Sequence, residues 1–298
     1  MRPSPSRREF LAASAAAVAG PALAADQPKK LVLIAGTPSH GPGAHEFNAG
    51  VQLLAKCLTG FPGLAVSISL NGWPKNPSVF DGAAGILIYA DGGAGHPAIE
   101  RDHLAFLGGL MNKGVGLMCA HFAVEVPKDK GGKEFQDWIG GYYEHEWSCN
   151  PIWRPEFKEF PKHPIANGVQ PFTIEDEWYF NMRFRPEMKG VTPILTAVPS
   201  DQVRNGPYVY PKGPYRHIRE AKGRSEHMMW AADRADGGRG VGFTGGHFHT
   251  NWKNDDFRKA VLNALVWICK LDVPKDGVES AVTDEDIGRN LDPKPTKK

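Results

Sequence analysis

The chain has 298 residues, of which 41% are hydrophobic and 23% are charged, and its formal net charge is +2. These proportions fit a globular protein with a substantial core and exclude global disorder. A charge of +2 without a basic run does not indicate a nucleic-acid-binding protein. Four cysteines in this length do not make a disulfide scaffold, whereas 11 histidines, many beside glycine or proline, suggest site chemistry.

The first 24 residues have the pattern of a targeting segment. Residues 6–11 read SRREFL, a twin-arginine motif, and an alanine-rich, weakly hydrophobic stretch and a small-residue cleavage pattern at 22–24 follow. The apolar stretch is too short for a spanning helix, so we expect no stable membrane insertion. We expect residues 1–24 to be a signal peptide that directs export, through the twin-arginine machinery, to the periplasm or the extracellular space. This segment has three arginines and one glutamate, so its net charge of +2 equals that of the whole chain, and the rest of the chain is neutral overall.

Apolar runs and helical spacing alternate along the rest of the chain. Continuous apolar runs predict strands at 31–35, 65–70, 85–90, 115–119, 227–231 and 240–244. Apolar residues at helical spacing predict helices near 47–58, 99–110 and 255–268, the last with Asn254 as its N-cap. This alternation predicts a doubly wound, mostly parallel α/β sheet with helices on both faces, in one domain over 25–273. We expect the charged, proline-containing residues 274–298 to form a loose tail.

Four loops that leave the predicted strands at their carboxyl ends carry histidines: His40 and His45, His96, His121, and His247 with His249. Ligands of an open parallel sheet bind beyond these ends, so the loops predict one site. Glu46, Asp91 and Glu177 are the carboxylates expected at the same cleft, as general bases or as orienting partners of a histidine. A turn role for Asp91 and a helix-terminus role for Glu46 remain alternatives.

The loop after residues 115–119 has the pattern of a strand-to-helix elbow. Such a turn needs small residues two positions before and two after the side chain that it presents. His121 meets this condition with Cys119 and Ala123, whereas Cys119 itself would have Leu117 and His121 there. We therefore place His121 at the elbow, which disfavours Cys119 as an exposed nucleophile.

Several segments together resemble the trehalose-utilisation (ThuA-like) family of the class I glutamine amidotransferase-like superfamily. The resemblance covers most of residues 29–273, and it rests on residues 36–50, 71–74, 91–97, 119–122, 176–179 and 245–252. It implies a flavodoxin-like fold and a role in carbohydrate metabolism. The superfamily's elbow cysteine matches His121, its catalytic histidine matches His249 and its glutamate falls on Asn251. Because two of three members differ, we do not expect a glutamine amidotransferase.

The histidines found in this chain near the superfamily's catalytic positions could bind metal or transfer protons. His45, His121, His247 and His249 are candidate ligands of a divalent ion such as zinc, since alternate residues of an extended 247–249 segment would share a face. Metal-free acid–base work by His121, His249, Asp91 and Glu46 is the alternative, and a purely structural role is the third. We expect no nucleotide cofactor.

A small carbohydrate is the expected partner, and no nucleic acid is expected. Candidate substrate-binding residues are His40, His96, Trp147, Glu177, Trp178, Tyr179 and Asn251, although packing explains the aromatic ones as well. We expect an enzyme, a hydrolase or lyase, that cleaves or rearranges a disaccharide or keto-sugar derivative. A non-catalytic carbohydrate-binding protein and a Cys119-dependent hydrolase are the alternatives.

Overall fold

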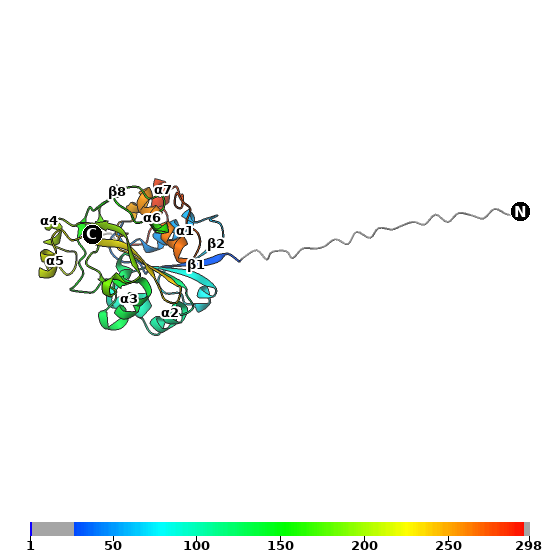
Figure 1. The fold of residues 1–298 in the computed structure, drawn as a ribbon, viewed down its shortest axis with the longest axis horizontal. Helices are drawn as coiled ribbons and strands as arrows, with labels where there is room; N and C mark the ends of the chain where they lie inside the picture. The colour runs from blue at the N-terminus through cyan, green and yellow to red at the C-terminus, as the bar shows by residue number, and fades with distance from the viewer. Residues whose placement is uncertain (2–26, 295–298) are drawn as a thin grey trace.

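A seven-stranded sheet forms the centre of the computed structural model, which describes Met1 and residues 27–294 (Figure 1). Its strands are β1 (Lys29–Ala35), β2 (Leu64–Ser69), β3 (Ala83–Tyr89), β4 (Gly116–Ala120), β11 (Val191–Ala197), β12 (Glu226–Asp233) and β13 (Arg239–Phe243). Their order is β11-β12-β13-β4-β3-β1-β2, and the five strands from β13 to β2 are parallel. The predicted mostly parallel α/β sheet is confirmed, whereas the expected signal peptide lies outside the described residues.

Helices cover both faces of this sheet, as predicted (Figure 1). Helices α1 (Phe47–Cys57) and α6 (Asp255–Ile268) lie on one face, and α2 (His103–Met111) and α3 (Lys133–Ile139) lie on the other. Alternate residues of β1 enter the two cores, because successive strand side chains point to opposite faces: Leu31 and Leu33 enter the first, Val32 and Ile34 the second.

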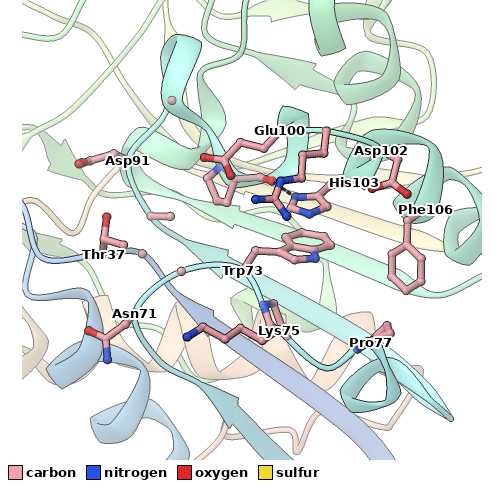
Figure 2. Close-up of a pocket in the computed structure, with 17 residues that line it drawn as sticks. Thr37, Asn71, Trp73, Lys75, Pro77, Asp91, Glu100, Asp102, His103 and Phe106 are labelled. Atoms are coloured by element: carbon pink, nitrogen blue, oxygen red, sulfur yellow. Dashed lines mark hydrogen bonds between the residues drawn. The ribbon is translucent and has the colours of Figure 1, made fainter.

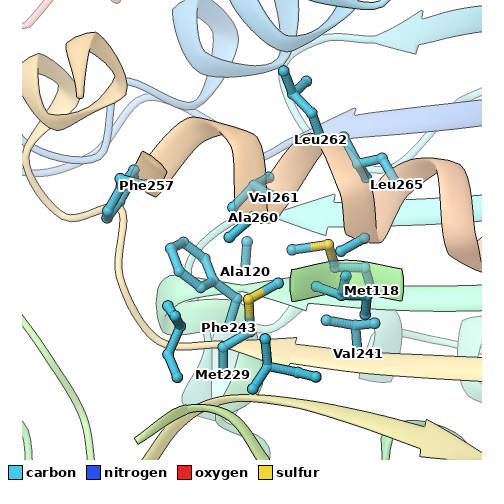
Figure 3. Packing of buried hydrophobic residues seen from close by; sticks show 14 of the residues in the cluster. Met118, Ala120, Met229, Val241, Phe243, Phe257, Ala260, Val261, Leu262 and Leu265 are labelled. Atoms are coloured by element: carbon cyan, nitrogen blue, oxygen red, sulfur yellow. The ribbon is translucent and has the colours of Figure 1, made fainter. Parts of the chain in front are cut away.

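Helix α6 begins where its sequence predicts. The side chain of Asn254 accepts a hydrogen bond of 2.9 Å from the backbone N–H of Phe257, and Asp255 and Asp256 occupy the first turn. Figure 3 shows Val261 and Leu265 of α6 above the sheet residues Met118 and Val241, all of them fully buried. The helix thus covers the centre of the parallel sheet and helps to fix the strand ends that carry the site.

The described chain also contains shorter helices and strands. They are the helices α4 (Asp201–Arg204), α5 (Arg216–Glu220) and α7 (Asp284–Gly288), and the strands β5 (Gly141–Tyr142), β6 (Ile152–Trp153), β7 (Glu156–Phe157), β8 (Phe172–Thr173), β9 (Asp176–Glu177) and β10 (Arg183–Phe184). The two-residue strands pair as β10-β5, β6-β9 and β7-β8. None of the helices formed by residues 27–294 has the length and hydropathy of a membrane-spanning helix.

The expectation of a loose tail is wrong for residues 274–294. Val278 is buried, and its N–H donates to the side chain of Asn263 in α6 at 2.8 Å. Helix α7 begins with a capping box at Thr283. Residues 274–294 are ordered because their polar groups find partners in the domain, and Asp292 lies beside the loop that follows β1.

Candidate metal centre

The strand order brings together the loops in which the sequence places histidines. Strands β1 and β3 are neighbours, while β2 pairs with the other edge of β1, so the chain changes direction across the sheet between β1 and β3. Crevices at such switch points, beyond the carboxyl ends of the strands, are the usual ligand sites of doubly wound sheets. The loops after β1, β3, β4 and β13 carry His45, Asp91, His121 and His247, and these four side chains meet there.

Backbone pairing between two of these loops places His45 beside His247. Ala44 and Phe248 form an isolated antiparallel bridge, and the N–H of His45 donates to the carbonyl of His247 at 3.0 Å. His45 has a left-handed backbone with φ of 49°. The turn directs its imidazole inward, where it is almost fully buried.

His121 lies at the elbow that the sequence predicts. It follows β4 directly, begins the 3-10 helix η4 (His121–Val124) and has φ of 55°. Gly92 in the loop after β3 permits this turn, since a Cβ there would lie 2.0 Å from the carbonyl oxygen of Phe122.

The short strand β9 supplies the carboxylate of the site. Asp176 accepts hydrogen bonds from the backbone N–H groups of Gly246 (2.8 Å) and His247 (3.0 Å), which joins β9 to the loop after β13. Asn251 donates to Asp176 at 3.0 Å and holds it in place. Glu177 then follows, with Oε2 at 2.7 Å from Nδ1 of His247 and Oε1 accepting from Asn150 at 2.8 Å.

Three imidazoles and one carboxylate form a compact cluster of His45, His121, Glu177 and His247, whose four ligand atoms lie within 4.8 Å of one another. Nε2 of His45 is 3.0 Å from Nε2 of His121 and 3.0 Å from Nδ1 of His247. The third nitrogen pair, between His121 and His247, is separated by 3.3 Å, and Glu177 Oε2 is 3.8 Å from His121.

Hydrogen bonds outside the cluster determine which nitrogens carry protons. Nδ1 of His45 faces a carboxylate oxygen of Asp91 at 2.8 Å, and Nδ1 of His121 faces the carbonyl oxygen of Thr244 at 3.0 Å. Both partners accept, so both Nδ1 atoms donate and both Nε2 atoms carry lone pairs. Two lone pairs therefore face each other at 3.0 Å. Such a contact is repulsive unless a cation lies between them or another group, such as the Tyr179 hydroxyl 3.2 Å from His121, donates a proton.

The electrostatics of the cluster favour neutral imidazoles. Burial, followed by the nearby His40 and His247, lowers the pKa of His45 far below its ordinary value. Burial and the neighbouring His45 and His247 likewise lower the pKa of His121. A neutral imidazole is the form that binds metal. Burial also raises the pKa of Glu177. A cation would oppose this shift by stabilising the carboxylate.

The donor set fits a divalent metal of the zinc type. Three imidazole nitrogens and one carboxylate oxygen are common zinc ligands, and bonds of about 2.0–2.1 Å in a tetrahedron place neighbouring ligand atoms about 3.3 Å apart. Five of the separations between these ligand atoms lie between 2.7 and 3.8 Å, on either side of that value. Asp91 and Thr244 orient two ligands from outside, as carboxylates and carbonyls do around metal-bound histidines. The cluster could therefore hold a metal ion.

A cavity of about 610 Å³ opens beside the cluster. His45, Glu177 and Tyr179 line it, together with His40, whose ring stacks on His45 at 3.6 Å. Glu125, which was not among the residues predicted from the sequence, also lines it. The available signal was its position four residues after the elbow, immediately beyond η4.

The carboxyl group of Glu125 has no close ionic partner among the described residues and has a strongly raised pKa. Its nearest ionic partner among the described residues is Nδ1 of His145, 3.8 Å away. Burial, and secondarily the charge of Glu177, raises the pKa of Glu125 to about 8. The cavity therefore contains a carboxyl group that is protonated near neutral pH.

Three of the four expected catalytic residues lie outside the cluster, although Asp91 contacts it through His45. His249 begins the 3-10 helix η8 (His249–Lys253), and the metal-ligand group does not include it. The carboxylate of Glu46 accepts from the N–H groups of Gly43 at 2.8 Å and Asp292 at 2.7 Å, and it lies 3.3 Å from Lys294 Nζ. Glu46 therefore anchors the tail to the loop after β1.

Most of the expected substrate-binding residues also have other partners. His96 is fully buried, with Nε2 on the carbonyl of Ala123 and Nδ1 accepting from the N–H of Ala98, both at 3.0 Å. Trp178 is a core residue, and Trp147 stacks on His217 at 4.7 Å. His40, Glu177 and Tyr179 line the cavity, whereas Asn251 contacts Asp176 instead.

Cys119 does not have the surroundings of a nucleophile. Its side chain is fully buried, it does not line the cavity, and burial raises the pKa of its thiol far above the ordinary value. A reactive cysteine needs the opposite conditions, namely exposure and a lowered pKa. The geometry therefore favours His121 as the functional residue of this loop.

Comparison with known proteins agrees with the fold. The model of the ThuA family, described as trehalose utilisation, matches residues 85–268, more than half of the chain. A ThuA-like protein from Bacteroides uniformis has a similar solved structure, with a TM-score of 0.57, 18% identity, and coverage of 85% of this chain and 96% of its own. A ThuA-like protein from Parabacteroides merdae gives 0.55 and 15%, with coverage of 88% and 99%. No curated protein matches. The chain belongs to the ThuA (trehalose utilisation) family.

Proposed function

We propose that this protein is an exported, metal-dependent enzyme that cleaves or rearranges a sugar derivative. The cluster of His45, His121, His247 and Glu177 beside a cavity of about 610 Å³ carries the proposal. The substrate class, a disaccharide or keto-sugar derivative, is supported by the description of the family as trehalose utilisation. Export is supported by the twin-arginine pattern of residues 6–11.

A divalent ion held by these four residues would act as a Lewis acid on a substrate oxygen. Asp91 and Thr244 fix the tautomers of His45 and His121, so that the Nε2 lone pairs point into the cluster. Tyr179, with its hydroxyl 3.2 Å from Nε2 of His121, offers a hydrogen-bond donor at the wall of the cavity.

Glu125 is the residue best placed to move a proton in this cavity. Because its pKa is raised to about 8, it holds a proton at neutral pH and can give it to an oxygen of a leaving group. Once ionised, it can take a proton from a substrate carbon or hydroxyl. A carboxyl group beside a Lewis-acid site is suited to hydrolysis or elimination, which agrees with a hydrolase or lyase.

Metal analysis of the mature protein tests this proposal. After loading with Zn²⁺ and desalting, we expect about one ion per chain in the wild type and none in His121→Ala. His249→Ala and the exposed His145→Ala are matched controls and should retain the ion, with thermal melts confirming that each variant is folded. Zinc-free wild-type protein, or equal metal content in all four proteins, would contradict the metal site.

Incubation with disaccharides and their keto derivatives tests turnover. Product formation that is lost in His121→Ala and after chelation supports the enzyme. Sugar binding by the metal-loaded protein without product after long incubation would instead support the non-catalytic carbohydrate-binding protein.

A further inference from the structure

A second cavity, of about 600 Å³, lies at the carboxyl ends of β1, β2 and β3 (Figure 2). Asp91 and Gly95 line it, whereas Gly92, Gly93 and Ala94 between them line the cavity beside the metal cluster. The segment 91–95 therefore divides the two cavities. Asp91 belongs to both regions, because its Oδ1 atom accepts from Nδ1 of His45 at 2.8 Å while its side chain is 32% exposed.

The polar groups of this second cavity have mixed charge. Lys75 and Arg101 supply cationic donors, and Asp91, Glu100 and Asp102 supply carboxylate acceptors. Within residues 27–294, Lys75, Arg101, Glu100 and Asp102 make no ion pair, so their polar atoms are available to a ligand. An anion would face three carboxylates, and a cation would face two cationic side chains. A neutral ligand with many hydroxyl groups matches both kinds, since each hydroxyl donates and accepts.

Aromatic side chains also line this cavity. The ring of Trp73 stacks on that of His103 at 4.4 Å, and Phe106 lies beside them, as Figure 2 shows. Nδ1 of His103 donates to the carbonyl of Pro97 at 2.7 Å, which leaves its Nε2 as an acceptor. Apolar walls with a few convergent polar groups are typical of small-molecule sites. Arg101 has a left-handed backbone with φ of 47°, a strained conformation of the kind found at ligand sites.

We propose that this second cavity is a subsite for a neutral sugar ring, coupled to the metal cluster through Asp91. A hydroxyl of the ring that donates to Asp91 would share the carboxylate with Nδ1 of His45. Occupancy of the subsite would then change the basicity of a metal ligand. The assignment of this ring to the same substrate as the metal centre rests on the proposed function, whereas the existence of the subsite does not.

Calorimetry on the metal-free protein tests the subsite. Glucose and trehalose are the neutral probes, glucose 1-phosphate is the anionic probe and glucosamine is the cationic one. We expect the neutral sugars to bind, and the charged sugars to bind at least about tenfold more weakly. Absence of binding by both neutral sugars, or tighter binding of either charged sugar, would overturn the proposal.

Substitutions on the cavity wall locate the binding. Arg101→Ala and Glu100→Gln change exposed side chains and should weaken binding of the neutral sugars about tenfold each, the usual effect of losing a hydrogen bond to a charged group. Lys130→Ala is the control, because Lys130 is exposed and lines neither cavity. Unchanged affinity in both wall variants would place the sugar elsewhere and overturn the proposal.

His247→Ala separates this proposal from the proposed function. Loss of zinc with retained binding of neutral sugars supports a subsite that is independent of the metal. Zinc binding without sugar binding in the wild type contradicts the subsite alone, and sugar binding without zinc contradicts the metal-dependent enzyme alone.

Discussion

Three histidines around the metal cluster have left-handed backbone conformations. The φ angles of His40, His45 and His121 are 58°, 49° and 55°. Residues other than glycine in this region cost on the order of 1 kcal/mol each, and such strain is concentrated at functional sites. In this protein the strain directs imidazole rings toward one point, where two of them are buried with opposed lone pairs. The folded state is therefore less stable than it would be without this cluster of histidines.

Asp91 is a positioning residue whose contribution can be measured. Replacing Asp91 by alanine removes the acceptor that keeps the proton of His45 on Nδ1. We expect zinc affinity to fall roughly 10- to 100-fold while the fold is kept, as for other partners of metal-bound histidines. Competition with a chromophoric chelator measures the affinity. Asp81→Asn is the control, because Asp81 is exposed and precedes β3, whereas Asp91 and the cluster lie at the other end of that strand. Equal affinities would show that Asp91 does not act on the metal.

His96 has a structural role, and we expect its titration to account for part of the pH dependence of the free energy of unfolding. Burial lowers its pKa to about 4, whereas the unfolded chain has the ordinary value near 6.5. The unfolded state therefore takes up the proton first, and stability falls as pH drops from 6.5 to 4, by about 3 kcal/mol for a shift of this size. Above pH 6.5 His96 is neutral in both the folded and the unfolded state, and its protonation no longer reduces the free energy of unfolding.

The variant His96→Asn isolates this contribution. Asparagine can still accept the hydrogen bond of the Ala98 N–H, but it does not titrate. Urea melts of the metal-free wild type and variant between pH 4 and 8 should give a flatter dependence for the variant. Parallel curves would show that His96 is not the group responsible.

At the scale of elements, the final residues of the described chain hold the loop that carries His45. Asp292 and Lys294 both contact Glu46, and the Lys294 and Glu46 side chains are 2% and 1% exposed. The N–H of Asp292 donates to the carboxylate, and the Lys294 ammonium lies 3.3 Å from it. This contact joins the tail to the N-cap of α1, the residue directly after His45 of the cluster.

Lys294→Ala should therefore destabilise the protein more than a surface substitution of the same kind. Removal of one partner leaves the Glu46 carboxylate buried with its two N–H donors alone, a loss of about 3 kcal/mol. Lys253→Ala removes an exposed ion pair with Asp284 and should cost no more than about 0.5 kcal/mol. Denaturant melts at pH 7 measure both, and similar small losses would show that the buried pair is not stabilising.

The burial and the position of each element in the sheet explain which elements could be predicted from the sequence. Parallel strands buried on both faces are continuous apolar runs, so β1, β3 and β4 were predictable, as was α6 from its cap and periodicity. Strand β11 was missed because it is a half-buried edge strand that contains Pro193, a residue tolerated only at edges. The two-residue strands between 141 and 184 are too short to show any periodicity.

The sequence could predict which loops meet at the site, because the order of parallel strands determines this, but not every residue that binds there. Convergence of the loops follows from parallel strands, and it brings His45, His121 and His247 together. The choice between His247 and His249 depends on local backbone, since η8 begins at His249 and ends the alternation of an extended segment. Glu177 was expected at this cleft, but its place as a fourth ligand depends on the contacts of Asp176 with the 246–247 backbone, a long-range pairing that no sequence spacing encodes.

For the whole molecule, the free cysteines fit the export that we propose, provided that folding comes first. All four cysteines are free, and Cys119, Cys149 and Cys269 are buried. A chain that folds in a reducing compartment keeps such thiols apart, and burial then protects them in an oxidising one. The twin-arginine pattern belongs to a route that carries folded proteins, so a metal site could be complete before transport.

Replacing both Arg7 and Arg8 by lysine tests this order of events. A twin-arginine signal is read by a receptor, and lysine does not reproduce the planar guanidinium donors of arginine. We expect the variant to remain in the cytoplasm at precursor length, folded and able to bind zinc, while the wild type appears outside at mature length. Arg2→Lys, which lies outside the motif, should be exported normally. Fractionation with immunoblotting measures the distribution, and normal export of the double variant would mean that another route carries the protein.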